Sequence, residues 1–317
     1  MSGTDRHTME GPLKLYMEKL WQSLQAQPAV QLTDIPVSRA QLQGRISGDS
    51  FDGGKTEAWL SGLGSRATWR AVRDARTGHT IHCVSDRPWA ALTGDLKTGL
   101  RLLNWMSPRP IVWYWWDQSW TRQMPAAVDP GRDHINGGWA VPGILEVHVY
   151  RREEAHKVLL HESIHALGLD VPHASIEPVR VQFEAALGRR LWPHLGEAFT
   201  ELFAEWLWAI ASAKTLHAVT KAWGSQLVCS ERQAAIVWAR IHDATVDEDT
   251  NVFAYYVLKW VLMQPAFLVS ALIGPDHTVT HWFTWWQLSR PRLDSLAAAY
   301  AATEHQNIKM GMTCGTA

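Results

Sequence analysis

The residues best suited to do chemistry in this sequence form the run His161-Glu162-Ser163-Ile164-His165. In a helix, residues four apart lie one above the other, so His161 and His165 would present two imidazoles to one point on a single face. One zinc ion, Zn2+, accepts such a pair, and Glu162 would project toward the open coordination position. There Glu162 could take a proton from an attacking water. The run therefore predicts a metal site and a general base.

The sequence around this run favours a helix. Residues 158–167 are mostly apolar, and they follow a strand candidate at residues 144–150. The chain contains 15 histidines, so a chance match to the three positions is rare but has to be weighed. The simpler alternative is a pair of core or surface histidines beside an incidental glutamate.

A catalytic zinc site usually has a third protein ligand and keeps one position for water. In the metzincin pattern that ligand is a histidine six residues beyond the second histidine, but Val171 stands there. Asp170 and His173 are near misses in register. Gly168 is better explained as the C-cap of the helix. A third ligand from another part of the chain is therefore expected.

The stronger candidates lie on the apolar segment 197–210, which is expected to be helical. Glu197, Glu201 and Glu205 recur every four residues and would form one acidic stripe. Three like charges on one face repel each other, and their burial is costly unless a cation lies nearby. A metal ion held by two imidazoles would be such a cation. The alternative is that the stripe is the solvent-facing side of a core helix.

Together, the histidine run and the downstream run Glu201-Leu202-Phe203-Ala204-Glu205 resemble the gluzincin family of zinc metallopeptidases. In that family a downstream helix carries a ligand Glu, two variable residues, Ala and Asp. The resemblance implies that Glu201 is the third zinc ligand and that Glu205 orients a ligand histidine from the second shell. This sequence departs from the family in having Glu for Asp. Glu197 remains an alternative ligand.

A weaker similarity is to uncharacterised metallopeptidase-like proteins of large DNA viruses of protists. It implies a shared domain over residues 130–260, approximately, and brings no assigned substrate. The segments that carry it are residues 134–138, 149–154, 197–210 and 251–259.

The expected fold is of the α+β class. A small N-terminal mixed sheet would precede a predominantly helical half, and the resemblance implies that this half is zincin-like and contains the helix with the histidine run. We expect an extension of helix and loop at residues 1–75, a metallopeptidase domain at 76–290 and a tail at 291–317. The local patterns predict helices at 11–26 and 88–106, strands at 79–85, 110–116 and 144–150, and loops at 43–65 and 131–143.

Composition excludes some classes of partner. Thirty basic and 31 acidic residues leave a net charge of −1, which predicts no nucleic-acid binding. The one stretch of membrane length, residues 252–274, contains Lys259, Gln264 and Pro265, so buried helices are expected and a membrane span is not. Residues 1–27 lack the uninterrupted apolar stretch of a secretory signal.

The cysteines point to a compartment. Cys83, Cys229 and Cys314 are few and widely separated, which favours neither a disulfide framework nor a cysteine-rich metal cluster. Together with the lack of a secretory signal, this pattern favours a reducing, intracellular setting. The sequence says nothing about the oligomeric state.

These patterns together predict zinc-dependent hydrolysis of a peptide or protein substrate, with residues 144–150 holding an extended peptide by edge pairing. Two alternatives remain: an inactive relative that keeps zinc for structure or binding, and a hydrolase of non-peptide amides or esters. No motif selects the group that would stabilise the oxyanion. The candidates are Tyr255, Tyr256, His242, His277 and His281.

Overall fold

A computed structural model describes residues 11–46, 51–124, 131–241, 250–273, 278–301 and 308–309. The chain forms two compact units. The sheet unit is built on Ser23–Leu169, and the helical unit is built on Asp170–Asn307 together with the start of the chain up to Gln22. The combination of helices with a mixed sheet confirms the expected α+β class.

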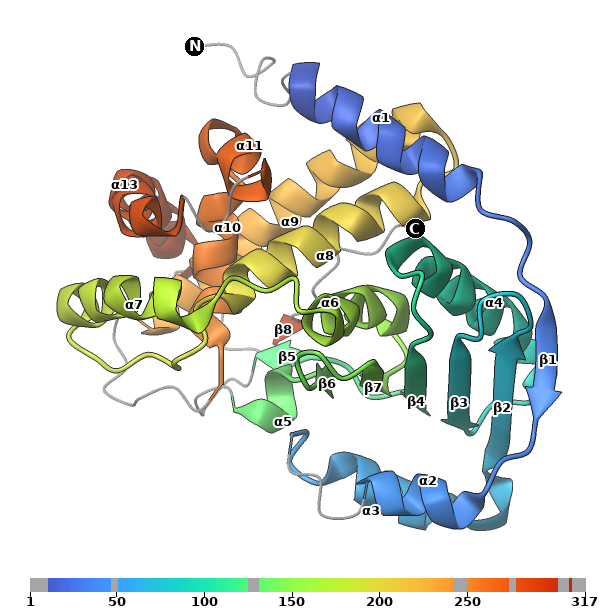
Figure 1. The fold of residues 1–317 in the computed structure, drawn as a ribbon. Coiled ribbons are helices and arrows are strands. Elements are labelled where there is room, and N and C mark those ends of the chain that lie inside the picture. The colour runs from blue at the N-terminus through green and yellow to red at the C-terminus, as the bar shows by residue number, and fades with distance from the viewer. Residues whose placement is uncertain are drawn as a thin grey trace. The chain divides into compact units, whose positions relative to one another are not determined.

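The sheet unit contains a six-stranded mixed sheet with the strand order β1-β2-β3-β4-β7-β6 (Figure 1). Its strands are β1 (Leu32–Ile35), β2 (Thr68–Asp74), β3 (Thr80–Ser85), β4 (Val112–Gln118), β6 (Gly138–Ala140) and β7 (Glu146–Arg151). β3, β4 and β7 are parallel, whereas every pair that includes β1, β2 or β6 is antiparallel. A second, two-stranded sheet pairs β5 (Gln123–Met124) with β8 (Ile308–Lys309).

Helices cover both faces of the larger sheet (Figure 1). They are α2 (Arg39–Ile46) and α3 (Lys55–Leu63) on one face, and α4 (Trp89–Met106) and α6 (Ala155–Leu167) on the other. Successive side chains of β4 point to opposite faces of the sheet and contribute to the hydrophobic core on each face. Trp113 and Trp115 pack toward α4 and α6, whereas Tyr114 and Trp116 pack toward α2 and α3. This period of two is the one expected for a strand buried on both faces. The sheet thereby gives α6 a rigid base.

The helical unit is built from helices of very different length. They are α7 (His173–Leu187), α8 (Glu197–Ser212), α9 (Leu216–Ile241), a π-helical turn (Phe253–Leu258), α10 (Lys259–Leu262), α11 (Pro265–Ile273) and α13 (Trp282–Ala301), with most of α1 (Gly11–Gln25). Large aromatic side chains fill its interior, and Trp206, Trp223, Trp238, Trp260 and Trp282 are all fully buried. The abundant tryptophans of this unit are therefore largely core residues.

Most elements that the sequence predicts are present, with small shifts at their ends. Two expected loops are corrected. The stretch 43–65 contains the end of α2, all of α3 and the start of a short 3₁₀ turn, Gly64–Arg66. The stretch 131–143 contains α5 (Arg132–Ile135) and β6. The boundary expected near residue 75 falls inside the β2–β3 hairpin, so the sheet begins well before that point.

No single helix among the described residues is long and apolar enough to cross a membrane. The segments Phe253–Leu262 and Pro265–Leu272 pass that test only as a pair, and they are bent by 105° at the break between them. The bend falls at Pro265, where the sequence predicts a split into two helices.

Two of the three cysteines lie in the part of the chain that the structure describes. Cys83 is a free, buried thiol in β3, and burial raises the pKa of that thiol well above its usual value. Cys229, in α9, is disulfide-bonded.

Two glycines of α4 provide a matched test of the packing on this sheet. A Cβ at Gly99 would overlap the ring of Trp113, whereas a Cβ at Gly94 would have no neighbour within 4 Å. We expect Gly99→Ala to lower the free energy of unfolding by about 1–3 kcal/mol through overpacking. Gly94→Ala should raise it by up to about 1 kcal/mol, because alanine favours the helix. Urea denaturation of both variants checks the difference, and a stabilised Gly99→Ala protein would contradict the packing described.

Candidate metal centre

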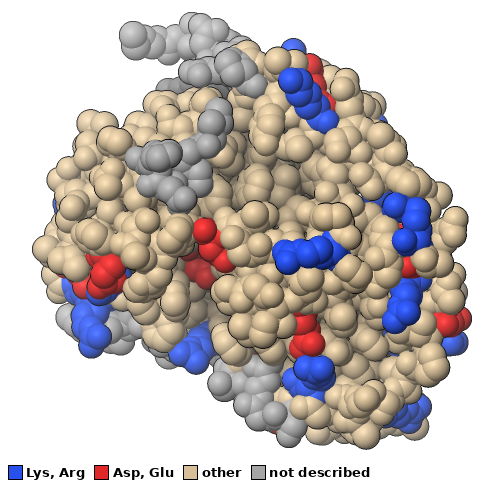
Figure 2. Space-filling model, in the orientation of Figure 1, with Lys and Arg blue, Asp and Glu red and all other residues tan. Residues whose placement is uncertain are grey.

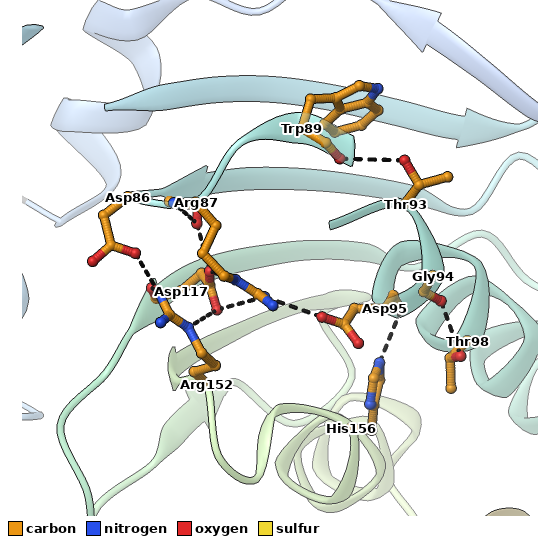
Figure 3. A network of polar contacts seen from close by, with 11 residues as sticks. Asp86, Arg87, Trp89, Thr93, Gly94, Asp95, Thr98, Asp117, Arg152 and His156 are labelled. Atoms are coloured by element: carbon orange, nitrogen blue, oxygen red, sulfur yellow. Dashed lines mark hydrogen bonds and ion pairs between the residues drawn. The ribbon is translucent and has the colours of Figure 1, made fainter. Parts of the chain in front are cut away.

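A buried carboxylate fixes the start of α6, the helix that contains the histidine run. Asp117, at the end of β4, accepts hydrogen bonds from Arg87 Nε at 2.7 Å and from Arg152 Nε at 3.0 Å (Figure 3). Arg152 lies three residues before α6, so this network ties the entry of the helix to the sheet. In the first turn of α6, His156 Nε2 lies 2.8 Å from the carbonyl oxygen of Asp95 in α4. Burial lowers the pKa of His156, which favours a neutral ring that donates to this carbonyl.

A glycine cap fixes the other end of α6. Gly168 has a φ of 68°, in the left-handed region that favours glycine. Its amide lies 2.9 Å from the carbonyl of His165, and the amide of Leu169 lies 3.0 Å from the carbonyl of Ile164. This closes the helix one turn after the second histidine, as the C-cap prediction required.

The two histidines of α6 point their ring nitrogens at each other. His161 Nε2 and His165 Nε2 are 3.1 Å apart, and the His161 side chain is only 3% exposed. Two imidazole nitrogens on one tetrahedral zinc, each bonded at about 2.0–2.1 Å, would be separated by about 3.3 Å. The pair therefore has nearly the spacing that a shared zinc ion requires.

Glu162 lies beneath the outer strand of the sheet. It is 5% exposed, and its Cγ is 3.1 Å from the position that a Cβ of Gly138 would occupy. A Cβ there would also overlap the carbonyl oxygen of His148 and come within 2.8 Å of Val158. Only glycine allows β6 to pack this closely on α6, so β6 lies directly over the candidate general base.

One expectation about the strands is corrected. β7 contains most of residues 144–150, which were expected to pair with a substrate, but it lies between β4 and β6. Among the described strands, β6 is the outermost one at this end of the sheet. The glycines of residues 137–138 suggested a loop and concealed this strand, since a three-residue strand has too short a pattern to detect.

Two donors for a metal ion lie on α6, in the sheet unit: the imidazoles of His161 and His165. Two imidazoles with one glutamate form a donor set found in catalytic zinc sites, and the two rings fit a zinc ion by type and by spacing. Glu197, the ligand that the sequence left as an alternative, is the first residue of α8 in the helical unit. Glu201 lies one turn further along the same helix.

No family model, curated protein or solved structure matches this chain. Among the described residues on the face drawn in Figure 2, basic and acidic side chains are interspersed and do not form a large patch of one sign.

The rest of the acidic stripe is buried. Glu201 is 0% exposed and Glu205 is 1% exposed, so these residues do not form the solvent-facing side of a helix. Glu205 Oε1 lies 2.6 Å from the ammonium nitrogen of Lys259, which is itself fully buried. Lys259 directly follows the π-helical turn, and no pattern in the sequence marks it as a partner of the stripe.

The other candidate residues lie as follows. Asp170 Oδ1 accepts a hydrogen bond from Thr200 Oγ1 at 3.1 Å, and His173 is exposed beside His194. Tyr255 and Tyr256 lie in the π-helical turn and are buried. His281 lies in a 3₁₀ turn, Val279–His281. His242 and His277 lie outside the described residues.

The buried ion pair leads to a prediction about stability. Glu205→Gln removes the negative charge beside the buried Lys259 and should lower the free energy of unfolding by about 3–5 kcal/mol. Glu231→Gln is the matched control, because Glu231 pairs with the exposed Arg292 and its loss should cost less than about 1 kcal/mol. Chemical denaturation measures both. Equal effects would contradict a stabilising role for the Lys259–Glu205 pair, and the double variant Glu205→Met/Lys259→Met should cost less than the sum of its single variants.

Proposed function

We propose that this chain is a zinc-dependent hydrolase that cleaves peptide bonds. The observation that carries the proposal is the arrangement on α6, where two imidazole nitrogens face each other at 3.1 Å beside a glutamate that is 5% exposed. The types of these three residues, and the spacing of the two imidazoles, support metal binding by the histidines and proton transfer by Glu162.

His161, His165 and a glutamate of α8 would hold the zinc ion. When bound, zinc activates a water molecule and polarises a carbonyl group. Glu162 would accept the proton of the attacking water and then pass it to the leaving amine. The buried position of Glu162 under β6 restricts the access of bulk water to its side chain.

We assign the third ligand to Glu197 rather than to Glu201. The spacing from Glu197 to Glu201 is the same as that from Glu201 to Glu205, so a shift by one helical turn preserves a ligand followed by an orienting carboxylate. Glu205 already binds Lys259, so it is not available to orient a ligand histidine, and Glu197 with Glu201 is the pair left for the two roles. Glu201 would then take the orienting role that the family resemblance gives to Glu205.

The strand β6 would hold the substrate. Tyr150 N donates to Gly137 O at 2.8 Å, and hydrogen-bonded pairs alternate along an antiparallel ladder. Trp139 therefore bonds to β7, whereas the amide and carbonyl groups of Gly138 and Ala140 point away from β7. An extended peptide could pair with these groups directly above Glu162.

The decisive experiment compares the wild-type protein with Glu162→Gln. We expect both proteins to bind about one zinc ion, because Glu162 is not a ligand. Hydrolysis of a mixed peptide library should be lost in Glu162→Gln, by a factor of at least about 10², and in wild-type protein treated with a chelator. Elemental analysis and mass spectrometry measure zinc and products.

His161→Ala is the control that should lose both zinc and activity. Wild-type protein that stays metal-free in excess zinc would overturn the proposed site. Zinc binding without chelator-sensitive cleavage of any peptide would leave a structural or binding role, or hydrolysis of another amide or ester.

A second pair of variants tests the third ligand. Loss of an orienting carboxylate weakens metal binding by about 10–100-fold, and loss of a ligand should weaken it further. We therefore expect Glu197→Gln to reduce zinc affinity more than Glu201→Gln, as measured by competition with a chromophoric chelator. The reverse order would make Glu201 the ligand, and two negligible effects would remove α8 from the site.

A further inference from the structure

A column of stacked rings crosses the sheet and ends at β6. Four strands contribute one ring each from paired positions: His82 in β3, Tyr114 in β4, His148 in β7 and Trp139 in β6. Successive ring centroids lie 5.1, 4.8 and 4.0 Å apart, close to the separation of neighbouring strands, about 4.7–4.9 Å. The next position in the column, beyond Trp139, is therefore the one that a side chain of a further strand would take.

The ring of Phe51 already occupies this position. It is stacked on Trp139 with centroids 5.5 Å apart and an interplanar angle of 18°. That separation is close to the distance between the Cβ atoms of residues opposite each other on neighbouring strands, about 4.5–5.5 Å. Because His148 is stacked on the same ring at 4.0 Å, both faces of Trp139 are covered.

Hydrogen bonds to the backbone and to the next residue hold Phe51 beside β6. Asn136 Nδ2 donates to the carbonyl of Phe51 at 2.7 Å. The next residue, Asp52, is fully buried and accepts hydrogen bonds from the amides of Gly54 and Thr56 at 2.9 and 2.7 Å. These contacts fix the point from which the Phe51 side chain extends toward Trp139.

Phe51 and Glu162 lie on opposite faces of the sheet. Gly138 faces α6 and Glu162, whereas Trp139 packs on the opposite face, against the core under α2 and α3. A peptide paired with the outer edge of β6 would alternate in the same way. Its backbone and its side chains on the α6 face would avoid the Phe51 ring. The side chain of the one residue opposite Trp139 would collide with that ring.

We propose that Phe51 determines specificity by excluding side chains opposite Trp139, so that substrates have glycine at this position. Glycine has no side chain and would leave the Phe51 ring in place. Even the methyl group of alanine would have to displace the ring, which would lose its stacking on Trp139 and return apolar area to water. The inference rests on the proposed peptidase function and adds the class of substrate, extended peptides with glycine at one fixed position.

The test uses the full-length, zinc-loaded protein and a synthetic peptide library that varies one position at a time. We expect wild-type cleavage to select glycine at one position near the cut. Replacement of that glycine by alanine should lower kcat/KM at least about tenfold, because one surplus carbon in a site changes this ratio by about 10–200-fold. The loss should fall mainly on KM, since the collision affects binding of the substrate.

Phe51→Ala should relax this selection. We expect the variant to cleave the alanine peptide with a kcat/KM at least about tenfold above that of wild type, because the excluding ring is gone. A gain of this kind cannot come from a variant that fails to fold. Phe267→Ala is the matched control, since Phe267 is stacked on Trp285 at 4.9 Å in the helical unit and its loss should leave the selection of glycine unchanged.

The outcomes separate this inference from the peptidase proposal. Cleavage without selection of glycine at any position, or a selection that Phe51→Ala does not relax, overturns the role of Phe51 while the peptidase proposal stands. If wild-type protein cleaves no peptide, the peptidase proposal fails and retention of the same peptides on immobilised protein decides. Glycine peptides alone retained by wild type, with alanine peptides also retained by Phe51→Ala, support the role. Equal retention of both peptides by wild type, or retention of neither, overturns it.

Discussion

The close approach of α6 to the β6–β7 end of the sheet is the constraint on which the site depends. A Cβ at Gly138 would overlap the backbone of β7 and crowd Val158 and Glu162, so β6 can lie over the helix only because this residue is glycine. The packing buries Glu162 and brings a strand with outward hydrogen-bonding groups directly above it. The contact between β6 and α6 thus determines both the local fold and the surroundings of the proposed general base.

In each unit, ion pairs between residues that are distant in the sequence hold the elements in place. In the sheet unit, the carboxylate of Asp117 binds two arginines and fixes the start of α6. In the helical unit, Lys259 neutralises the last carboxylate of the acidic stripe. Such groups are costly to bury unless they are paired, so their geometry is well defined. A well-defined geometry suits a metal centre, because the positions and orientations of its ligands must be held within narrow limits.

The sequence predicts the long elements well because their patterns extend over many residues. The helix at residues 88–106 is α4, and the strands near residues 80 and 112 are β3 and β4. Prediction from the sequence fails where the local structure depends on only a few residues. Residues 137–138 were expected to be in a loop because glycine usually interrupts regular structure, yet Gly138 belongs to the edge strand. The disulfide at Cys229 was not predicted, because the count and spacing of cysteines do not reveal which of them meet in space.

The choice among the glutamates of α8 shows the limit of sequence reasoning most clearly. A four-residue repeat puts Glu197, Glu201 and Glu205 on one face, and a shift by one turn maps the first two onto the last two. Any motif that asks for two acidic residues at this spacing therefore matches twice. Only the surroundings break this symmetry: Lys259 binds Glu205, which leaves Glu197 and Glu201 as the pair available to the metal. The repeat itself carries no information about which turn binds the metal, so the assignment has to come from neighbours that are distant in the chain.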